Sequence, residues 1–133
     1  MKSIVISVLA FISIGSLFSL SQQTGPAMQL AETFHDFGDV TEGQEVEYVF
    51  KYTNTGNQSL VLTQVHTTCG CTVPKWSTQP LAVGKTGEIL VHYNSAGKSG
   101  IQNKQIIIQS NAANADPANP MKVTIRVNVL PKK

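Results

Sequence analysis

The stretch "MKVTIRVNVL", residues 121–130, decides the fold class. Apolar side chains alternate strictly with polar ones along it. The apolar positions are Met121, Val123, Ile125, Val127 and Val129, and the polar positions are Lys122, Thr124, Arg126 and Asn128. Successive side chains of a β-strand point to opposite faces, so a period of two predicts a strand with one buried face.

The same alternation recurs upstream. In "EVEYVFKYTN" (45–54) and "EILVHYN" (88–94) one face is apolar, and its members are Val46, Tyr48, Phe50 and Tyr52 in the first stretch and Ile89, Val91 and Tyr93 in the second. "LVLTQV" (60–65) and "KQIIIQS" (104–110) are apolar enough for two more strands, and β-branched residues favour strands throughout. Since no stripe with a period of 3.6 residues follows residue 21, we expect no substantial helix.

Turn-forming segments separate these strands. They are "TEGQ" (41–44), "NTGN" (54–57), "VGKTG" (83–87), "NSAGKSG" (94–100) and the longer polar loop "NAANADPANP" (111–120). Glycine and asparagine tolerate the backbone angles of tight turns. About seven short antiparallel strands in roughly 100 residues predict an all-β domain, an Ig-like β-sandwich over residues 33–131. An open barrel is the alternative.

The N-terminus carries a different pattern. After Lys2, an apolar run extends from Ile4 to Leu20 and is followed by small residues. This predicts a secretory signal peptide over residues 1–21, cleaved after Ser21, with an uncleaved membrane anchor as the alternative. Residues 22–32 are small and polar and predict a flexible lead. The protein is therefore expected in the periplasm or outside the cell, without stable membrane insertion after cleavage.

Charge and motifs narrow the class of function. The formal net charge is +2, and the lysines and arginine are scattered, which does not indicate a nucleic-acid or anionic-membrane partner. The sequence contains no nucleophile elbow, hydrolase triad context or phosphate-binding loop. These observations predict a protein that is not an enzyme and holds no cofactor.

The segment "VHTTCGCTVPKW" (65–76) contains both cysteines of the chain, Cys69 and Cys71. In an oxidising compartment a turn at Gly70 would let them form a small disulfide ring. Alternatively, both thiols pack as small hydrophobic residues in the core. Pro74 is expected to end strand pairing here, and Trp76 to cover the end of the sandwich.

A third alternative is a soft-metal site. His66, Cys69 and Cys71 offer an imidazole and two thiolates, which copper(I) or zinc prefers. A closed zinc site needs four ligands, and the sequence has no second cysteine pair. Catalytic thiol chemistry usually uses two cysteines separated by two residues at a helix start. The bridged and packed forms are therefore preferred to metal, and catalysis ranks last.

The sequence also resembles a known family. "FHDFGDVTEGQEVEYVFKYTNTGNQSLVL" (34–62), "TTCGCTVPKW" (67–76), "LAVGKTGEILVHYN" (81–94) and "NKQIIIQSNA" (103–112) resemble domain of unknown function 1573. The matching signature residues are Phe34, Phe37, Gly38, Val40, Gly43, Phe50, Asn54, Gly56, Cys69, Gly70, Cys71 and Thr72. Val83 departs from the pattern, because the family often has proline before Gly84. The resemblance implies an exported bacterial Ig-like domain related in fold to major-sperm-protein and ASH-type domains, and it implies no activity.

Together these features predict an exported Ig-like binding or scaffolding domain. Its partner is expected to be another extracytoplasmic protein, which an edge strand of the sandwich would bind. The alternative is a thiol redox or copper- or zinc-binding protein that uses the Cys69–Cys71 segment.

Overall fold

A computed structural model describes residues 24–133 of the chain. Within these residues there are eight strands and no helix, so the predicted all-β class is confirmed. The strands are β1 (Met28–Leu30), β2 (Phe34–Thr41), β3 (Glu45–Asn54), β4 (Leu62–Thr67), β5 (Thr72–Trp76), β6 (Thr86–Asn94), β7 (Gly100–Ser110) and β8 (Met121–Leu130). The expected signal peptide, residues 1–21, lies outside the described residues.

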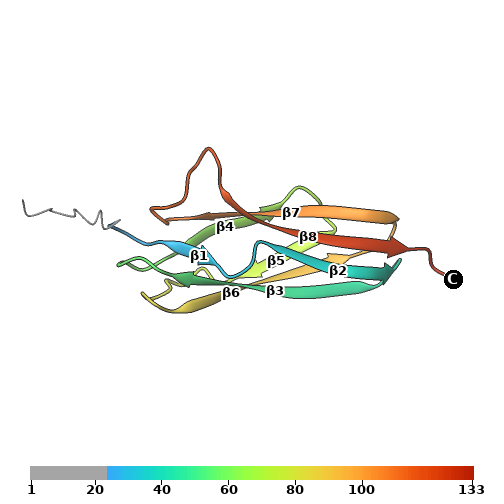
Figure 1. The fold of residues 1–133 in the computed structure, drawn as a ribbon, viewed down its shortest axis with the longest axis horizontal. Helices are drawn as coiled ribbons and strands as arrows, with labels where there is room; N and C mark the ends of the chain where they lie inside the picture. The colour runs from blue at the N-terminus through green and yellow to red at the C-terminus, as the bar shows by residue number, and fades with distance from the viewer. Residues whose placement is uncertain (1–23) are drawn as a thin grey trace, which may run out of the picture.

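The strands form two four-stranded sheets in a sandwich. One sheet has the order β1-β3-β6-β5 and the other the order β2-β8-β7-β4. Figure 1 shows the layer of β4, β7 and β8 lying over the layer of β3 and β6. The chain changes sheets at every connection from β1 to β5 and again between β6 and β7. The edge strands β1 and β2 lie along one long side of the sandwich, and β4 and β5 lie along the other.

The core lies between the sheets, where the sequence pattern places it. In β8, Val123, Ile125 and Val127 are fully buried, as the alternation predicts. Ile89, Val91 and Tyr93 of β6 are also fully buried, and Phe50 and Tyr52 of β3 face them from the neighbouring strand. Burying large apolar side chains is the main source of stability in such a domain.

The ordered domain begins earlier than residue 33. Residues 22–32 are expected to be a flexible lead, but Met28–Leu30 forms β1 and pairs antiparallel with β3. Met28 is only 2 % exposed and belongs to the core. Three residues are too few to show a periodic pattern, which is why the sequence does not reveal this strand.

The pairing of β2 also differs from the expected antiparallel sandwich. β2 lies parallel to β8, with Phe34 opposite Thr124 and Thr41 opposite Leu130. Its register shifts between Asp36 and Asp39. The reason is topological, because β2 joins the second sheet through a short connection from β1 rather than through a hairpin with β8.

Pro74 does not end strand pairing, contrary to the expectation. It lies in the middle of β5, opposite Val91 of β6. The amide of Asn94 donates to the Cys71 carbonyl at 2.9 Å, so the alternate residues 71, 73 and 75 face β6. The backbone of Pro74 therefore points to the outer edge, where a missing N–H interrupts no ladder bond.

Candidate functional site

The Cys-Gly-Cys segment forms the link between the two sheets. Residues 68–71 connect the end of β4 to the start of β5. The amide of Thr72 donates to the Cys69 carbonyl at 3.2 Å, which closes a turn around Gly70 and Cys71. The Thr67 hydroxyl lies 2.8 Å from the Cys69 carbonyl oxygen and 3.1 Å from that of Thr72. These contacts hold the link against the ends of both strands.

The turn brings the two cysteines together. Their sulfur atoms are adjacent and their Cα atoms are 5.3 Å apart. The Cys71 amide also points at the Cys69 sulfur, at 3.3 Å, and Cys71 packs against the core. Gly70 does not have a positive φ, and a Cβ added to it would meet no atom of residues 24–133. The turn therefore does not depend on the backbone freedom of glycine.

His66 is not grouped with the cysteines into a cluster of three metal-ligating side chains within residues 24–133. It lies on β4 opposite Ile107, and its Nδ1 atom is buried without a hydrogen-bond partner among the described residues. No group of three or more His, Cys, Asp or Glu side chains within residues 24–133 could hold a metal ion. Trp76 is the last residue of β5, lies opposite Ile89 and packs against the core.

Asn54 is the most deeply buried polar side chain of the signature. It is fully buried, and its Oδ1 atom accepts hydrogen bonds from the amides of Gly56 at 3.0 Å and Ala27 at 3.5 Å. Its Nδ2 atom donates to the carbonyls of Gln58 at 2.7 Å and Leu81 at 3.0 Å. One amide therefore joins the segment before β1, the turn after β3 and the loop before β6.

The turn after β3 requires glycine at position 56. A Cβ at this position would overlap the Gly25 carbonyl oxygen and the Ala27 nitrogen. The close approach lets the Asn57 amide donate to the Gly25 carbonyl at 3.0 Å. The Asn-x-Gly part of the signature is thus explained by the packing of the domain start.

A side chain that the sequence does not single out covers the free edge of β1. Asn114, in the long polar loop, accepts from the Met28 amide at 3.1 Å and donates to the Met28 carbonyl at 2.9 Å. This is the pair of bonds that a neighbouring strand would make with Met28. The only sequence signal is that Asn114 lies in an Asn-rich loop, and its partner is 86 residues away.

An aromatic cluster joins β2 to β3. The rings of His35 and Tyr48 are stacked, with centroids 3.5 Å apart, and Phe37 meets both edge-on. The Tyr48 hydroxyl donates to the Glu32 carboxylate at 2.7 Å, and this hydrogen bond raises the pKa of Tyr48. Phe34, by contrast, is 50 % exposed and lies outside this cluster.

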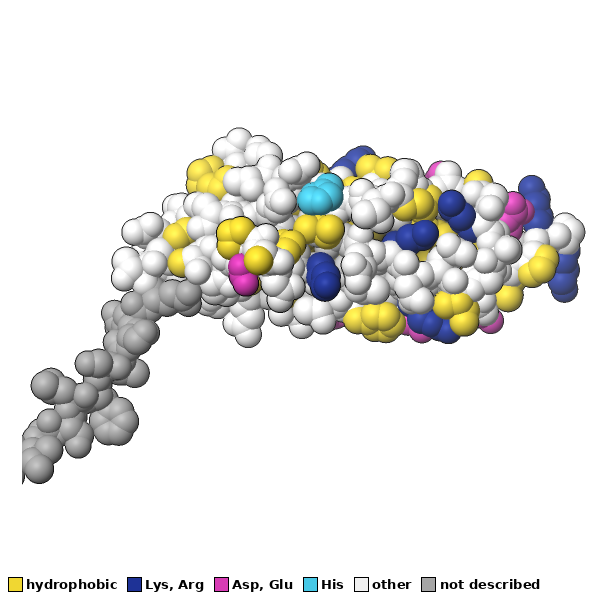
Figure 2. All heavy atoms as spheres, turned by 90° about the horizontal axis from the view of Figure 1, so that it is seen from above, with side chains coloured by type: hydrophobic (Ala, Val, Ile, Leu, Met, Phe, Trp, Pro, Cys, Tyr) yellow, Lys and Arg dark blue, Asp and Glu magenta, His cyan; other side chains and the backbone are white. Residues whose placement is uncertain are grey.

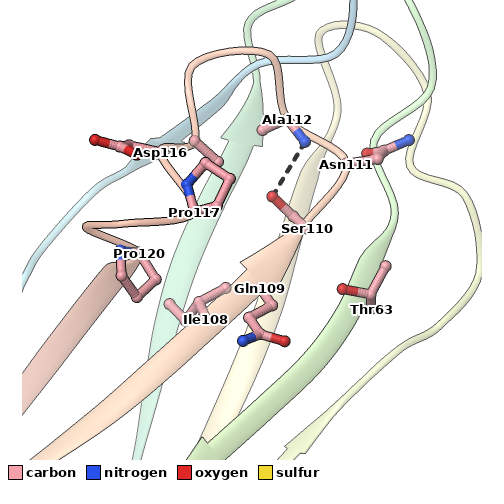
Figure 3. Close-up of a pocket in the computed structure, with 10 residues that line it drawn as sticks. Thr63, Ile108, Gln109, Ser110, Asn111, Ala112, Asp116, Pro117 and Pro120 are labelled. Carbon is pink, nitrogen blue, oxygen red and sulfur yellow. Dashed lines mark hydrogen bonds between the residues drawn. The ribbon is translucent and has the colours of Figure 1, made fainter.

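The described residues also contain an open hollow of about 440 Å³ beside the polar loop. Figure 3 shows Thr63 and Gln109 on one side of it and Asp116 and Pro117 on the other. The Ser110 hydroxyl in its wall already accepts from the Ala112 amide at 3.2 Å. The lining combines polar side chains, such as those of Thr63 and Gln109, with apolar ones, such as those of Ile108 and Pro120.

On the face seen in Figure 2, most lysine and arginine side chains lie on the right-hand half of the view. Uncharged and acidic side chains lie between them. No helix within residues 24–133 is long and apolar enough to cross a membrane.

Comparisons with known proteins agree with this architecture. A family model described as "Protein of unknown function (DUF1573)" matches residues 28–129. No curated protein matches the chain.

Among solved structures, a protein of unknown function from Porphyromonas gingivalis W83 superposes with a TM-score of 0.67 at 16 % identity. The match covers 85 % of this chain and 51 % of that one, so this chain spans about half of its length. PapD-like domain 7 of human CEP192 gives a TM-score of 0.64 at 6 % identity, covering 80 % of this chain and 87 % of that one. The E. coli chaperone DraB gives 0.51 at 10 % identity, covering 80 % and 56 %. At these identities the likeness concerns the fold.

Proposed function

We propose that this chain, which belongs to the DUF1573 family of proteins of unknown function, is a binding or scaffolding domain that engages another protein outside the cytoplasm. The observation that carries the proposal concerns the edge strands of the sandwich. Particular residues determine whether their outward backbone groups are free or already hydrogen-bonded. Sheet edges offer unpaired N–H and C=O groups, which is how many domains bind an extended partner.

The fold neighbours support the same role. One of them is a chaperone by name, and another is a PapD-like domain. They provide precedents for this sandwich in proteins of that kind. Because a fold hosts many functions, the argument for this chain rests on its own edges.

Export is part of the proposal. Residues 1–21 combine Lys2, an apolar run and small residues near Ser21, the pattern of a cleaved signal peptide. Mass spectrometry of the protein isolated from cells tests it, and we expect a mature chain that begins at Gln22. A full-length chain retained in the membrane fraction would contradict this and favour an anchor.

A capture experiment tests the binding role. The tagged protein is expressed in its own host, crosslinked in intact cells and recovered from the envelope fraction. We expect one or a few proteins that are absent when an exported tag alone is used. Recovery of no partner, together with catalytic turnover of a substrate by the purified protein, would overturn the proposal.

The cysteines support a second, narrower proposal. The adjacent sulfurs of Cys69 and Cys71 favour a disulfide that forms on export and holds the link between the sheets. Thiol counting before and after reduction tests it, and we expect reduction to expose two reactive thiols. Stoichiometric copper or zinc that is lost in Cys69→Ser would instead support the soft-metal function, and a bridge that cycles with a partner thiol would support a redox function.

A further inference from the structure

We infer that the partner binds at the outer edge of β2, around Phe34 and Asp36, as an added strand from an extended segment rich in lysine or arginine. The inference rests on the proposed protein-binding function and names the surface and the chemistry of the partner. Four strands lie at sheet edges, β1 and β5 in one sheet and β2 and β4 in the other. Among these edges, β2 has outward backbone groups at two alternate residues that no other hydrogen bond of the described residues occupies.

The backbone direction of β2 shows which groups are free. The amide of Thr124 donates to the Thr33 carbonyl at 2.8 Å, and Phe34 lies opposite Thr124. In a parallel ladder alternate residues bond to the neighbouring strand, so the N–H and C=O groups of Phe34 and Asp36 point away from β8. No turn or side-chain hydrogen bond within residues 24–133 occupies these groups.

The edge of β1 is closed by a side chain. β1 has three residues, and the Asn114 amide occupies both backbone groups of Met28. The next outward residue, Leu30, ends the strand. An added strand would have to displace Asn114 before it reached the backbone of β1.

The other two edges lie on the opposite side of the sandwich. In β5, the outward amide of Thr72 is used by the Cys69 carbonyl, and Pro74 has no N–H. In β4, Leu62 and Val65 are 1 % and 3 % exposed, Thr63 and Gln64 between them are exposed, and the register shifts between Leu62 and Gln64. Just before β4, Leu60 exchanges two backbone hydrogen bonds with Leu81, at 2.9 and 2.7 Å.

Phe34 gives the open edge an apolar contact. Its side chain is 50 % exposed, although it belongs to the signature and lies on an otherwise structured strand. Burial in this domain therefore does not explain it. A strand added along β2 would place a side chain beside this ring, and aromatic residues are among the most effective contacts across neighbouring strands.

Charge specifies the partner. Most acidic residues of the chain lie between positions 32 and 47, and no lysine or arginine occurs from residue 3 to residue 50. Arg126 pairs with Asp36 at 2.9 Å, but the nearby carboxylates of Asp39 and Glu42 contact only uncharged groups among the described residues. Carboxylates along an edge attract a strand that carries cationic side chains and repel an acidic one.

The test uses a synthetic eight-residue peptide of alternating lysine and valine with blocked ends. It is titrated into the purified, ¹⁵N-labelled protein and followed by NMR. We expect saturable shifts centred on Phe34 and Asp36 and slower hydrogen exchange of these two amides. A peptide with glutamate in place of lysine is expected to bind at least about tenfold more weakly, because its charges are repelled.

Two sets of variants separate the edge from the charge. Phe34→Pro removes one outward N–H, as Pro74 does on β5, and we expect about five- to tenfold weaker binding. Asp39→Asn with Glu42→Gln is expected to weaken binding about threefold and reduce its salt dependence. Glu88→Gln, on β6 opposite Lys51, is the matched control and should leave binding unchanged.

If Phe34→Pro fails to fold, a peptide N-methylated at alternate residues removes the complementary bonds, those that the peptide N–H groups would donate to the carbonyls of Phe34 and Asp36, and it should not bind. Peptide binding elsewhere, or equal binding of the glutamate peptide, would overturn the inference and leave the protein-binding function standing. Self-association that Phe34→Pro abolishes would also overturn it, since the occupant would then be a second copy. Failure to bind any peptide or envelope protein would remove the proposed function as well.

Discussion

The edge strands on the two long sides of the sandwich differ in whether their outward backbone N–H and C=O groups are occupied. On the side of β4 and β5, the cysteine turn occupies the outward amide of Thr72, Pro74 has no outward N–H, and Leu60 just before β4 pairs with Leu81. On the side of β1 and β2, the Asn114 side chain occupies the outward backbone groups of β1. In β2, the outward N–H and C=O groups of Phe34 and Asp36 are free.

The comparison teaches that closure of an edge comes from particular side chains. A bare strand edge is a template for pairing with another chain, and proteins manage this hazard with proline, bulges and covering loops. Here such devices act at the other three edges, whereas β2, before its own register shift between Asp36 and Asp39, has free outward groups and carries an exposed aromatic ring beside carboxylates. This is the edge at which we propose that the partner binds.

A substitution of Asn54 should have the largest effect on stability, because its side chain is hydrogen-bonded to segments on both long sides of the sandwich. It bonds to Ala27 before β1 and to Leu81 beside β4. Asn54→Ala leaves several buried backbone groups without partners, so we expect the free energy of unfolding to fall by about 3 kcal/mol. Urea denaturation measures this.

Asn128→Ala serves as the control, because Asn128 donates to Asp39 at the surface and its loss should cost less than about 0.5 kcal/mol. A loss below about 1 kcal/mol for Asn54→Ala would mean that the two sides are held independently.

Gly56 and Gly70 form a matched pair, one near each side. Gly56→Ala would drive a Cβ into the backbone of Gly25 and Ala27, and we expect a loss of about 2 kcal/mol. Gly70→Ala, in the cysteine turn, meets no described atom and needs no positive φ, so its cost should stay within about 0.5 kcal/mol. Thermal unfolding of both variants checks this, and equal losses would contradict the assignment of close packing to Gly56 alone.

The sequence predicts the central strands well because their burial is periodic. β3, β6 and β8 each have one face in the core, and alternation reports that directly. β1 is too short for a period, and its position depends on Met28 packing and on Asn114. The parallel pairing of β2 depends on how the chain crosses between sheets, which no local pattern records.

The candidate site is predictable only in part. The turn at the cysteines follows from the sequence, whereas the way Pro74 faces depends on the register between β5 and β6. His66 lies near the cysteines along the chain, but strand geometry pairs it with Ile107. The closed and open edges are set by contacts between residues far apart in sequence, such as Asn114 with Met28.

Pro74→Thr would open the closed side and so make the two sides alike. Threonine supplies an outward N–H at the middle of β5, beside Val73, which is 46 % exposed. Stability should change by no more than about 1 kcal/mol, because no ladder bond is altered. We expect self-association to rise, measured by light scattering against protein concentration.

Val73→Thr is the matched control, since the backbone of Val73 already faces β6 and gains no edge donor. Greater association of both variants would show that side-chain chemistry, and not the new N–H, is responsible.

The smallest effect concerns the open edge and its dependence on pH. The Gly38 amide donates to Asp36 at 2.8 Å, and this bond, with the nearby Arg126 guanidinium, lowers the pKa of Asp36 below its ordinary value of 3.8. A lowered folded-state pKa stabilises the fold above the unfolded pKa, and this stabilisation is lost as pH falls through the folded value. In Asp36→Asn, the free energy of unfolding should therefore decline less steeply on acidification than in the unaltered protein, as denaturant titrations at a series of acidic pH values would measure. Because a short backbone hydrogen bond is screened less than exposed charges, most of the difference should survive added salt. If the two proteins declined in parallel, Asp36 would not hold the turn at Gly38, and the open edge would have to be ordered by β8 alone.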